Sequence, residues 1–335
     1  MPTEKLAIDF DSVYTNIYML GSGLVLSEHT VAAVSHDEKC EVKAIGDDAR
    51  KLIGKTAKNT KIVFPVFEGE IVNEKVAFGL LKGFLRKLGT KSSLSGSHVL
   101  FSVPCGVTPE LIQKYKNLAK SCGLGKTFFA EAPVLSALGQ RIPLNDSSPC
   151  FVIDMAGGTT NSAAVSLDGV IAGISVNFGA NKVSTDIIDF LIDNYGIQVG
   201  LPTAERLKNE IGSLDELDAL TAVVNGRDVA TGAPCSKSIK ANEIFEPIKK
   251  FYDKILELST LVLKKLPPEV SAEIRHSGVY VSGIGANVYG LKKYYENLLG
   301  IQVNVADNCL SSVALGGGVV IGDKDLLKKI TLPIK

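Results

Sequence analysis

Short apolar runs alternate with longer stretches that carry apolar residues at helical spacing, and this alternation continues along the whole chain. Short runs bounded by Gly, Asp and Ser turns are typical of β-strands. They predict strands at residues 6–8, 15–20, 24–26, 98–103, 128–130 and 279–281, and a second hairpin from Phe151. Helical spacing predicts helices at residues 76–88, 109–123, 131–139 and 247–266. Strands that alternate with helices indicate an α/β fold.

The longest predicted helix, residues 247–266, is amphipathic. Its apolar face carries Ile248, Phe251, Tyr252, Ile255 and Leu258. Such a stripe predicts packing against the protein core, and a partner-binding face is the alternative. Elsewhere, the Gly/Ser-rich residues 89–97 predict a flexible loop, and the more polar residues 37–59 predict a small peripheral insertion.

Two short segments of the chain resemble each other. Residues 8–16 read IDFDSVYTN, and residues 153–161 read IDMAGGTTN. Ile8, Asp9, Thr15 and Asn16 each have an identical residue 145 positions later, and both segments join an apolar run to a turn and a second apolar run. The shared strand–turn–strand context predicts an internal repeat.

Two facing hairpin turns of this kind can hold a chain of phosphate groups from both sides through backbone N–H groups. Hydroxyl donors would come from Ser12, Thr15, Thr159 and Thr160. Gly157 and Gly158 let the backbone approach an anion closely. Asp9 and Asp154, at strand ends, suit the water shell of a phosphate-bound Mg²⁺. Ordinary turns rich in glycine and aspartate are the alternative interpretation.

Composition narrows the classes of function. The 335 residues predict two domains or lobes. The 36 Lys and Arg residues balance 36 Asp and Glu residues, which gives no broad basic surface for nucleic acid. The six cysteines are scattered without a CxxC pair, which predicts free thiols in a reducing cytosol rather than a zinc site. The sequence shows no signal peptide and no apolar stretch of transmembrane length.

Segments typical of one protein family occur in a fixed order along nearly the whole chain. They are residues 103–106 (VPCG), 154–160 (DMAGGTT), 203–212 (TAERLKNEIG), 242–244 (NEI), 266–270 (LPPEV), 282–286 (SGIGA) and 316–318 (GGG). By these segments the chain resembles the MreB-like bacterial actins, within the superfamily of actin, heat-shock chaperones and sugar kinases.

The resemblance implies an actin-like α/β fold of two similar lobes, each with a mixed β-sheet flanked by helices. Residues 1–145 would form the first lobe with a small insertion at about 30–65, and residues 316–335 would return to it. Residues 146–315 would form the second lobe with a small subdomain at about 181–240. ATP or ADP would bind with Mg²⁺ in the cleft between the lobes.

The resemblance also implies a set of nucleotide contacts. They are Asp9, Asp11, Ser12, Val13, Tyr14, Gly157, Gly158, Thr159, Gly179, Glu205, Lys208, Gly283, Ile284 and Gly285. The glycine-rich 283–285 segment would back the adenine and ribose, because a strand that ends in glycines allows flat contact with a base. Glu205 and Lys208 share a helix face and would approach the nucleoside from the other side; a solvated ion pair is the alternative.

The implied catalytic residues are Glu131, Asp154 and Thr160. Glu131 would orient the water that attacks the γ-phosphate, while Asp154 could assist and Thr160 could help to hold the water. A carboxylate favoured by the helix dipole at a helix start is the alternative for Glu131. Asp9 and Asp154 would hold Mg²⁺ through water.

The first turn departs from the family pattern. Glycine and threonine are usual where this chain has Asp11 and Ser12, and Tyr14 replaces a small polar residue. Asp11 places a carboxylate near bound phosphate, and like charges 4 Å apart repel by about 1 kcal/mol in water and by several in a drier cleft. Ala156 and Ala180 also replace usual glycines. These changes indicate slow ATP turnover, a specialised paralogue of the magnetosome type, or a scaffold that does not hydrolyse ATP.

The predicted function is that of a nucleotide-dependent cytoskeletal protein, which forms filaments for cell shape or intracellular organisation. The expected location is the cytoplasm, with the inner face of the cell membrane as a second site. Residues 1–5 are too few for an amphipathic helix and the loop around Leu94 is a weak anchor, so direct membrane binding and docking through a membrane-protein partner are both open. A chaperone is disfavoured because no substrate-binding domain follows residue 335, and a small-molecule kinase because of the likeness outside the two turns.

Overall fold

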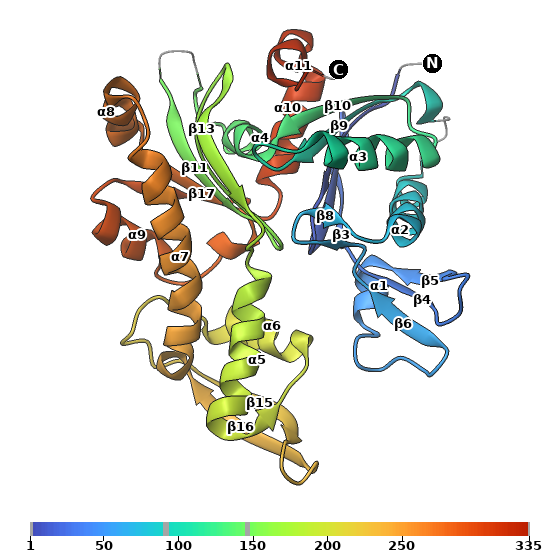
Figure 1. Ribbon diagram of the computed structural model, residues 1–335, viewed down its shortest axis with the longest axis vertical. Helices are drawn as coiled ribbons and strands as arrows, with labels where there is room; N and C mark the ends of the chain where they lie inside the picture. Colours follow the sequence, from blue (N-terminus) through green and yellow to red (C-terminus); the bar gives the residue numbers. More distant parts are fainter. Residues whose placement is uncertain (1–2, 90–93, 145–147, 334–335) are drawn as a thin grey trace.

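Two five-stranded mixed sheets with matching topology form the frame of the computed structural model, which describes residues 3–89, 94–144 and 148–333 (Figure 1). The first sheet has the order β10-β9-β1-β2-β3, with β1 (Lys5–Phe10), β2 (Tyr14–Met19), β3 (Gly23–His29), β9 (His98–Val103) and β10 (Lys126–Glu131). The second has the order β13-β12-β11-β17-β18, with β11 (Cys150–Met155), β12 (Thr160–Ser166), β13 (Gly169–Val176), β17 (Val279–Ser282) and β18 (Val303–Val305). Each sheet joins an antiparallel meander to two parallel strands, so the predicted repeat extends to the whole sheet.

Strand β1 shows how each sheet is covered on both faces. Leu6, Ile8 and Phe10 point to one face and pack in a core with α2 (Glu74–Lys87) and α3 (Pro109–Ser121). Ala7 points to the other face and packs in a second core with helices α4 (Ala132–Gly139) and α10 (Ser312–Gly322). The alternation follows from the period of two in a strand, and burial on both faces explains the nearly continuous apolar run.

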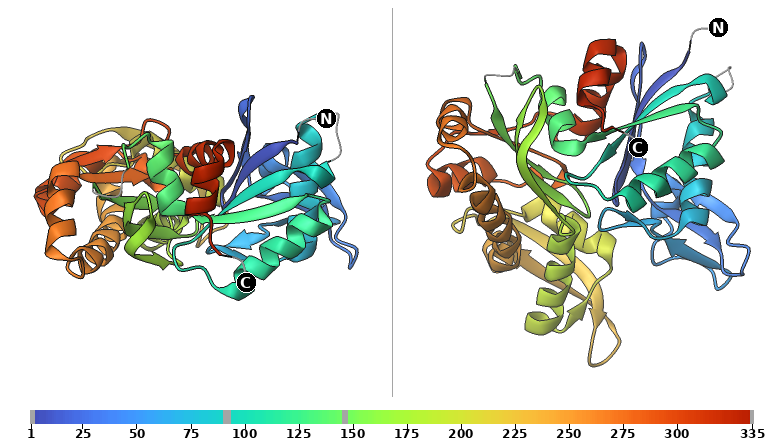
Figure 2. Two further views of the ribbon diagram at one scale, coloured as in Figure 1. Left: turned by 90° about the horizontal axis from the view of Figure 1, so that it is seen from above. Right: turned by 45° about the horizontal axis from the view of Figure 1, so that its top comes forward.

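Helices α4 and α10 lie between the two sheets in all three views (Figures 1 and 2). Their backbones touch through glycines: a Cβ atom on Gly316 would lie 1.8 Å from the carbonyl oxygen of Leu135, and one on Gly139 would lie 1.8 Å from that of Ser312. Side chains are therefore excluded at Gly139 and Gly316, whereas the next two glycines of the run face Ala7 of β1 and Tyr18 of β2.

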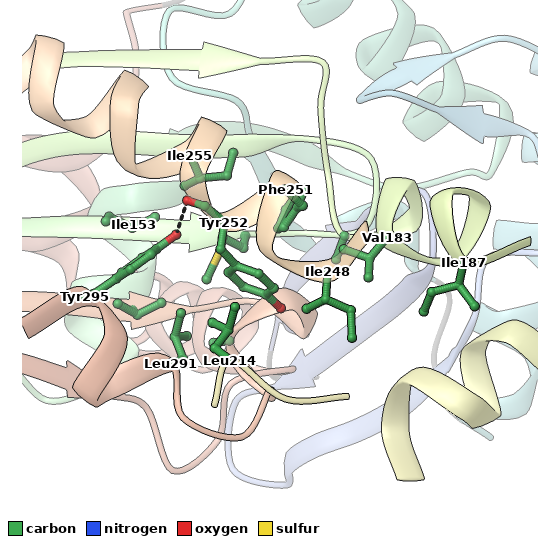
Figure 3. Close-up of a cluster of buried hydrophobic side chains, with 14 of the residues drawn as sticks. Ile153, Val183, Ile187, Leu214, Ile248, Phe251, Tyr252, Ile255, Leu291 and Tyr295 are labelled. Atoms are coloured by element: carbon green, nitrogen blue, oxygen red, sulfur yellow. Dashed lines mark hydrogen bonds between the residues drawn. The ribbon is translucent and has the colours of Figure 1, made fainter. Parts of the chain in front are cut away.

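The second sheet is covered by α7 (Phe245–Leu263), the longest helix of the described residues. Ile248, Phe251, Tyr252 and Ile255 are buried in one cluster, which confirms the prediction that this face packs in the core. Figure 3 shows the hydroxyl of Tyr295, on α9 (Leu291–Leu299), donating to the Tyr252 carbonyl at 3.0 Å. This bond satisfies a buried hydroxyl, which would otherwise destabilise the cluster.

A small peripheral unit extends from each sheet on the same side of the molecule (Figure 1). The first unit contains β4 (Ala32–Ser35), β5 (Val42–Ile45), α1 (Gly46–Arg50) and β6 (Thr60–Val63). The second contains α5 (Asn181–Tyr195), β14 (Ile197–Gln198), α6 (Leu201–Ile211), β15 (Thr221–Asp228) and β16 (Pro234–Lys240). Their three-stranded sheets were not predicted, because strands such as β5, β15 and β16 are largely exposed and lack a clear apolar pattern.

The remaining elements are β7 (Val66–Phe67), β8 (Glu70–Ile71), α8 (Pro268–Ser277) and α11 (Lys324–Ile330). Residues 90–93 of the predicted Gly/Ser loop lie outside the described residues, while Leu94–Gly96 form a 3₁₀ turn. Among the described residues, none of the helices is long and apolar enough to cross a membrane.

Candidate functional site

The β1–β2 turn and the β11–β12 turn face each other and are in direct contact. A Cβ atom on Gly157 would lie 2.1 Å from Cγ2 of Val13, and one on Gly158 would lie 2.3 Å from Oγ of Ser12. Both glycines are therefore required by a close approach of the two turns. The predicted pair of turns is brought together as expected, although 145 residues separate them in the chain.

Asp11 connects the two turns. Its Oδ2 accepts the N–H of Gly157 at 2.9 Å and the N–H of Val13 at 3.3 Å. Burial raises the pKa of the Asp11 carboxyl, and the N–H groups of Ser12 and Gly157 act in the opposite direction. The carboxylate thus turns into the backbone donors of both turns instead of pointing away from them.

Asp9 lies at the end of β1 with two polar neighbours. Its Oδ1 accepts the hydroxyl of Ser102 at 2.6 Å, and in the β1–β2 ladder it lies opposite Asn16. Burial and the nearby Asp11 raise the pKa of Asp9 to about 7. A negative charge on Asp9 is therefore energetically unfavourable unless a positive charge is close.

Asp154 repeats this arrangement in the second sheet. Its Oδ1 accepts the hydroxyl of Ser282 at 2.8 Å, and its Oδ2 accepts the side-chain N–H of Asn161 at 3.4 Å. Burial raises the pKa of Asp154 to about 6. Neither Ser102 nor Ser282 was predicted as a site residue, although Ser282 begins one of the family-like segments and Ser102 directly precedes another.

The carboxylates fit a hydrated Mg²⁺ better than a directly bound metal. Among the described residues, His, Cys, Asp and Glu form no group of three that could hold a metal ion directly. Asp9, Asn16 and Asp154 line one cavity, and the amide oxygen of Asn16 is buried there without a hydrogen-bond partner. Such oxygen atoms can accept hydrogen bonds from the waters of Mg²⁺, which usually keeps several of them.

This cavity lies between the two sheets and has a volume of about 60 Å³. Its lining includes Asp11, Tyr14, Tyr115, Thr159, Gly283 and Leu310. Pockets for small molecules usually have volumes of about 300–1,000 Å³. The space between the two turns is therefore too small for a whole nucleotide, and Glu205 and Lys208 are not part of its lining.

The sequence profile described as "MreB/Mbl protein" matches residues 3–329, nearly the whole chain. The chain belongs to the MreB/Mbl family. The cell shape-determining protein MreB of Escherichia coli K12 is 33% identical over 323 residues, which cover 95% of this chain and 93% of that protein. Mbl of Bacillus subtilis is 29% identical over 330 residues, which cover 98% and 99%.

Solved structures agree with this assignment. MreB5 of Spiroplasma citri bound to AMPPNP matches with a TM-score of 0.92 and 27% identity, and the match covers 98% of each chain. A double helical filament of MamK matches with a TM-score of 0.83 over 96% of this chain and 99% of that one, at 15% identity. The actin-like fold predicted from the sequence is therefore confirmed, and the MamK match shows the fold alone.

In this MreB/Mbl-family chain, many of the predicted nucleotide contacts line the cavity or lie next to its lining, including the 283–285 segment predicted to back the adenine and ribose. The cavity itself is lined by Asp9, Asp11, Tyr14, Asp154, Gly157, Thr159, Gly283 and Ile284. Behind them, Gly179 supports the second turn, because a Cβ atom there would lie 2.3 Å from the carbonyl oxygen of Gly157. Gly285 packs on Met155 in the same way, at 2.8 Å between the added Cβ and that of Met155.

Two predicted hydroxyl donors are engaged elsewhere. Thr160 donates to the carbonyl of Phe178 at 2.8 Å, and the hydroxyls of Thr15 and Thr30 bond to each other at 2.9 Å. Thr15 is fully buried and is absent from the cavity lining, so its expected place among the phosphate donors does not fit the structure. Its β-branched side chain instead packs inside the first sheet, as suits a strand residue.

Glu131 is the last residue of β10 and directly precedes α4, which confirms its predicted place at a strand-to-helix junction. Its Oε1 accepts the N–H of Gly106 at 2.8 Å, and its side chain makes no hydrogen bond that caps α4. Burial and the neighbouring Glu131 raise the pKa of the Cys105 thiol to about 12. Glu131 is therefore not part of the cavity lining, although its neighbour Ala132 is.

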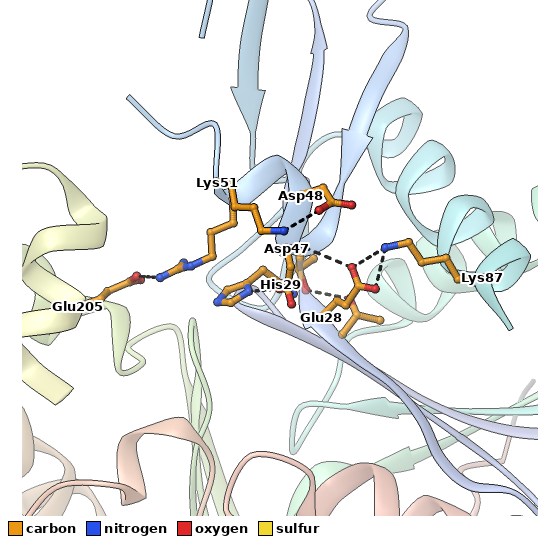
Figure 4. Close-up of polar contacts among 10 residues, drawn as sticks. Glu28, His29, Asp47, Asp48, Lys51, Lys87 and Glu205 are labelled. Carbon is orange, nitrogen blue, oxygen red and sulfur yellow. Dashed lines mark hydrogen bonds and ion pairs between the residues drawn. The ribbon is translucent and has the colours of Figure 1, made fainter. Parts of the chain in front are cut away.

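The predicted nucleoside residues lie at the junction of the two peripheral units. Glu205 on α6 forms an ion pair with Arg50 at the end of α1, and Figure 4 shows this bond reaching across from Glu205. Glu205 thus pairs with Arg50 rather than with Lys208, the partner that the alternative interpretation gave it. Burial lowers the pKa of Lys208, and Arg50 adds to this effect while Glu205 opposes it. The Arg50–Glu205 pair therefore links the two peripheral units directly.

Proposed function

We propose that this chain binds Mg²⁺-ATP between its two sheets, hydrolyses it slowly, and assembles into cytoskeletal filaments. The observation that carries the proposal is the pair of facing turns, whose backbone N–H groups converge on one anionic group between them. Membership of the MreB/Mbl family supports it, as do the structures of Spiroplasma citri MreB5 bound to AMPPNP and to ADP.

Each part of the site has a role in this proposal. Backbone N–H groups of both turns hold the phosphate oxygens, and Asp9, Asn16 and Asp154 hold the water shell of the cation. The cation would neutralise charge on the phosphates as it develops. Glu131 orients the attacking water after its bond to Gly106 is released, and the Thr160 oxygen can accept a hydrogen bond from that water.

Filament assembly rests on the family and on the fold. Head-to-tail contacts that do not close into a ring give open filaments, and an actin-like chain presents different surfaces at its two ends. A membrane or membrane-protein partner remains part of the proposal for the filament's location.

A scaffold that does not hydrolyse ATP is the second candidate. It is favoured by the bond from the Gly157 N–H to Asp11, which places a negative charge where the phosphates would lie. Both candidates share nucleotide binding and filaments, and they differ in phosphate release.

One experiment tests both. The purified full chain would be incubated with Mg²⁺-ATP, Mg²⁺-ADP or no nucleotide, and then examined by electron microscopy alongside an assay for released phosphate. We expect filaments with ATP together with slow phosphate release. Filaments without phosphate release would favour the scaffold. The absence of filaments together with the absence of nucleotide binding would refute the proposed function.

The substitution Asp9→Asn is expected to have opposite effects on stability and on binding. It removes a carboxylate whose ionised form is disfavoured by burial, so the free energy of unfolding should rise by about 1 kcal/mol. It also removes charge beside the cation, so Mg²⁺-dependent nucleotide affinity should fall about tenfold. Urea unfolding and equilibrium binding with and without Mg²⁺ measure the two effects. Asp48→Asn, at an exposed carboxylate on α1, is the control for the same change in net charge, and equal behaviour of both variants would contradict the role of Asp9.

The substitution Arg50→Ala is expected to speed nucleotide release about fivefold, because it removes the ion pair that holds the two peripheral units together over the nucleoside. The free energy of unfolding should also fall by about 1–3 kcal/mol, because the side chain of Glu205 is only 12% exposed and loses its partner. Stopped-flow release of a fluorescent nucleotide measures the rate. Lys51→Ala is the matched control, since the neighbouring Lys51 pairs with Asp48 on its own side. An unchanged release rate in Arg50→Ala would show that the pair does not restrain opening.

A further inference from the structure

Asp11 departs from the family pattern and also connects the two turns of the site. Its carboxylate accepts N–H groups from both turns, and the donor residues Val13 and Gly157 are 144 positions apart in the chain. A local turn in which an aspartate bonds to the residue two positions on accounts for the Val13 bond. It does not account for the bond to Gly157, which belongs to the other sheet.

The position that Asp11 takes is a built anion site. Two facing turns direct backbone N–H groups into one small volume, and glycines at positions 157 and 158 keep it free of Cβ atoms. Of the phosphates of a nucleotide, the terminal one has the most non-bridging oxygens. It is therefore the one best suited to accept donors from two opposite sides.

We propose that the Asp11 carboxylate takes the place of the terminal phosphate of a nucleoside triphosphate, so that this site prefers a nucleoside diphosphate. The inference rests on the proposed function, because it concerns the same site. A diphosphate can bind while Asp11 keeps its two N–H bonds. A triphosphate must displace the Asp11 side chain or bring another negative charge against it.

The surrounding charges strengthen this preference. Asp9 and Asp154 line the same cavity, so Asp11 is the third carboxylate at the site. Burial already disfavours the ionised form of each, and the coulombic effect of Asp11 is felt by both of the other two. One hydrated Mg²⁺ has less charge to offset when the added ligand is a diphosphate.

The test compares the affinities of ADP and of the non-hydrolysable triphosphate AMPPNP for the full chain in Mg²⁺, by competition against a fluorescent ADP. The variants are Asp11→Gly and Asp11→Asn, with Asp48→Asn as the control for net charge. We expect the native chain and the control to bind ADP at least about tenfold more tightly than AMPPNP. In Asp11→Gly the AMPPNP affinity should rise about tenfold while the ADP affinity changes less than about threefold.

Asp11→Asn guards against loss of the fold, because its amide oxygen can still accept the N–H groups of Val13 and Gly157. It removes the charge, so it should shift the ratio of affinities in the same direction as Asp11→Gly. Equal affinities in the native chain, or a ratio that both substitutions leave unchanged, would overturn the inference and leave the proposed function standing. Failure of every variant to bind either nucleotide would overturn both.

Discussion

Replacement of Glu131 by glutamine is expected to slow phosphate release from Mg²⁺-ATP by about 100-fold, the usual size of a lost general base or water-orienting carboxylate. The amide oxygen of glutamine can keep the bond to the Gly106 N–H, which the native carboxylate accepts at 2.8 Å. The substitution therefore removes charge from the junction of β10 and α4 without removing a structural contact. Nucleotide affinity should change less than about threefold, because Glu131 does not line the cavity.

Single-turnover phosphate release separates this effect from binding. Glu110→Gln on α3 is a suitable control, since that carboxylate lies in the first turn of a helix outside the cavity lining. Release from Glu131→Gln at the native rate would remove Glu131 from the catalytic set. If nucleotide binding and phosphate release are both lost, Glu131 instead has a structural role through its bond to Gly106.

The substitution Gly316→Ala is expected to lower the free energy of unfolding by about 3 kcal/mol, although alanine is the better helix former. The added Cβ would lie 1.8 Å from the Leu135 carbonyl oxygen, 2.6 Å from the carbonyl carbon of the same residue and 2.8 Å from the nitrogen of Gly139, all backbone atoms of α4. Backbone cannot move aside as a flexible side chain can, so α4 and α10 would have to separate. Urea unfolding followed by circular dichroism measures the change.

Gly96→Ala is the matched control for this prediction. An added Cβ at Gly96 meets no heavy atom within 4 Å, and the backbone there does not have a positive φ angle. Its stability should stay within about 0.5 kcal/mol of the native value. Equal stability of both variants would mean that the contact between α4 and α10 tolerates a wider spacing than the structure indicates.

Local sequence patterns predicted the elements that are long or strongly apolar. The strand at residues 98–103 has the predicted bounds, and the apolar stripe of α7 packs in the core as its spacing indicated. The repeat around Asp9 and Asp154 was visible because identical residues recur in the same turn context. Each of these signals lies within a short window of sequence, where periodicity and turn chemistry are informative.

The features that the sequence did not predict depend on pairing over long distances. Nothing near Arg50 indicates that it meets Glu205, 155 residues later, and nothing near Asp11 indicates a bond to Gly157. The exposed β15–β16 hairpin lacks clean alternation, so its strands could be found only through their partners. The role of Ser102 depends on a parallel neighbour strand, which brings its hydroxyl to Asp9.

The contact between α4 and α10 is a point about which the two halves of the molecule can rotate. The two helices meet backbone to backbone between the sheets, whereas α1 and α6, which carry Arg50 and Glu205, lie toward the other end of the molecule (Figure 1). At Gly139 and Gly316 no side chain lies between the two backbones, so the helices cannot shift there by rearranging side chains. Because the two peripheral units lie far from this contact, a slight rotation about it would move them by a large distance. The size and charge of a small anion bound close to this contact would therefore set the separation of the two peripheral units.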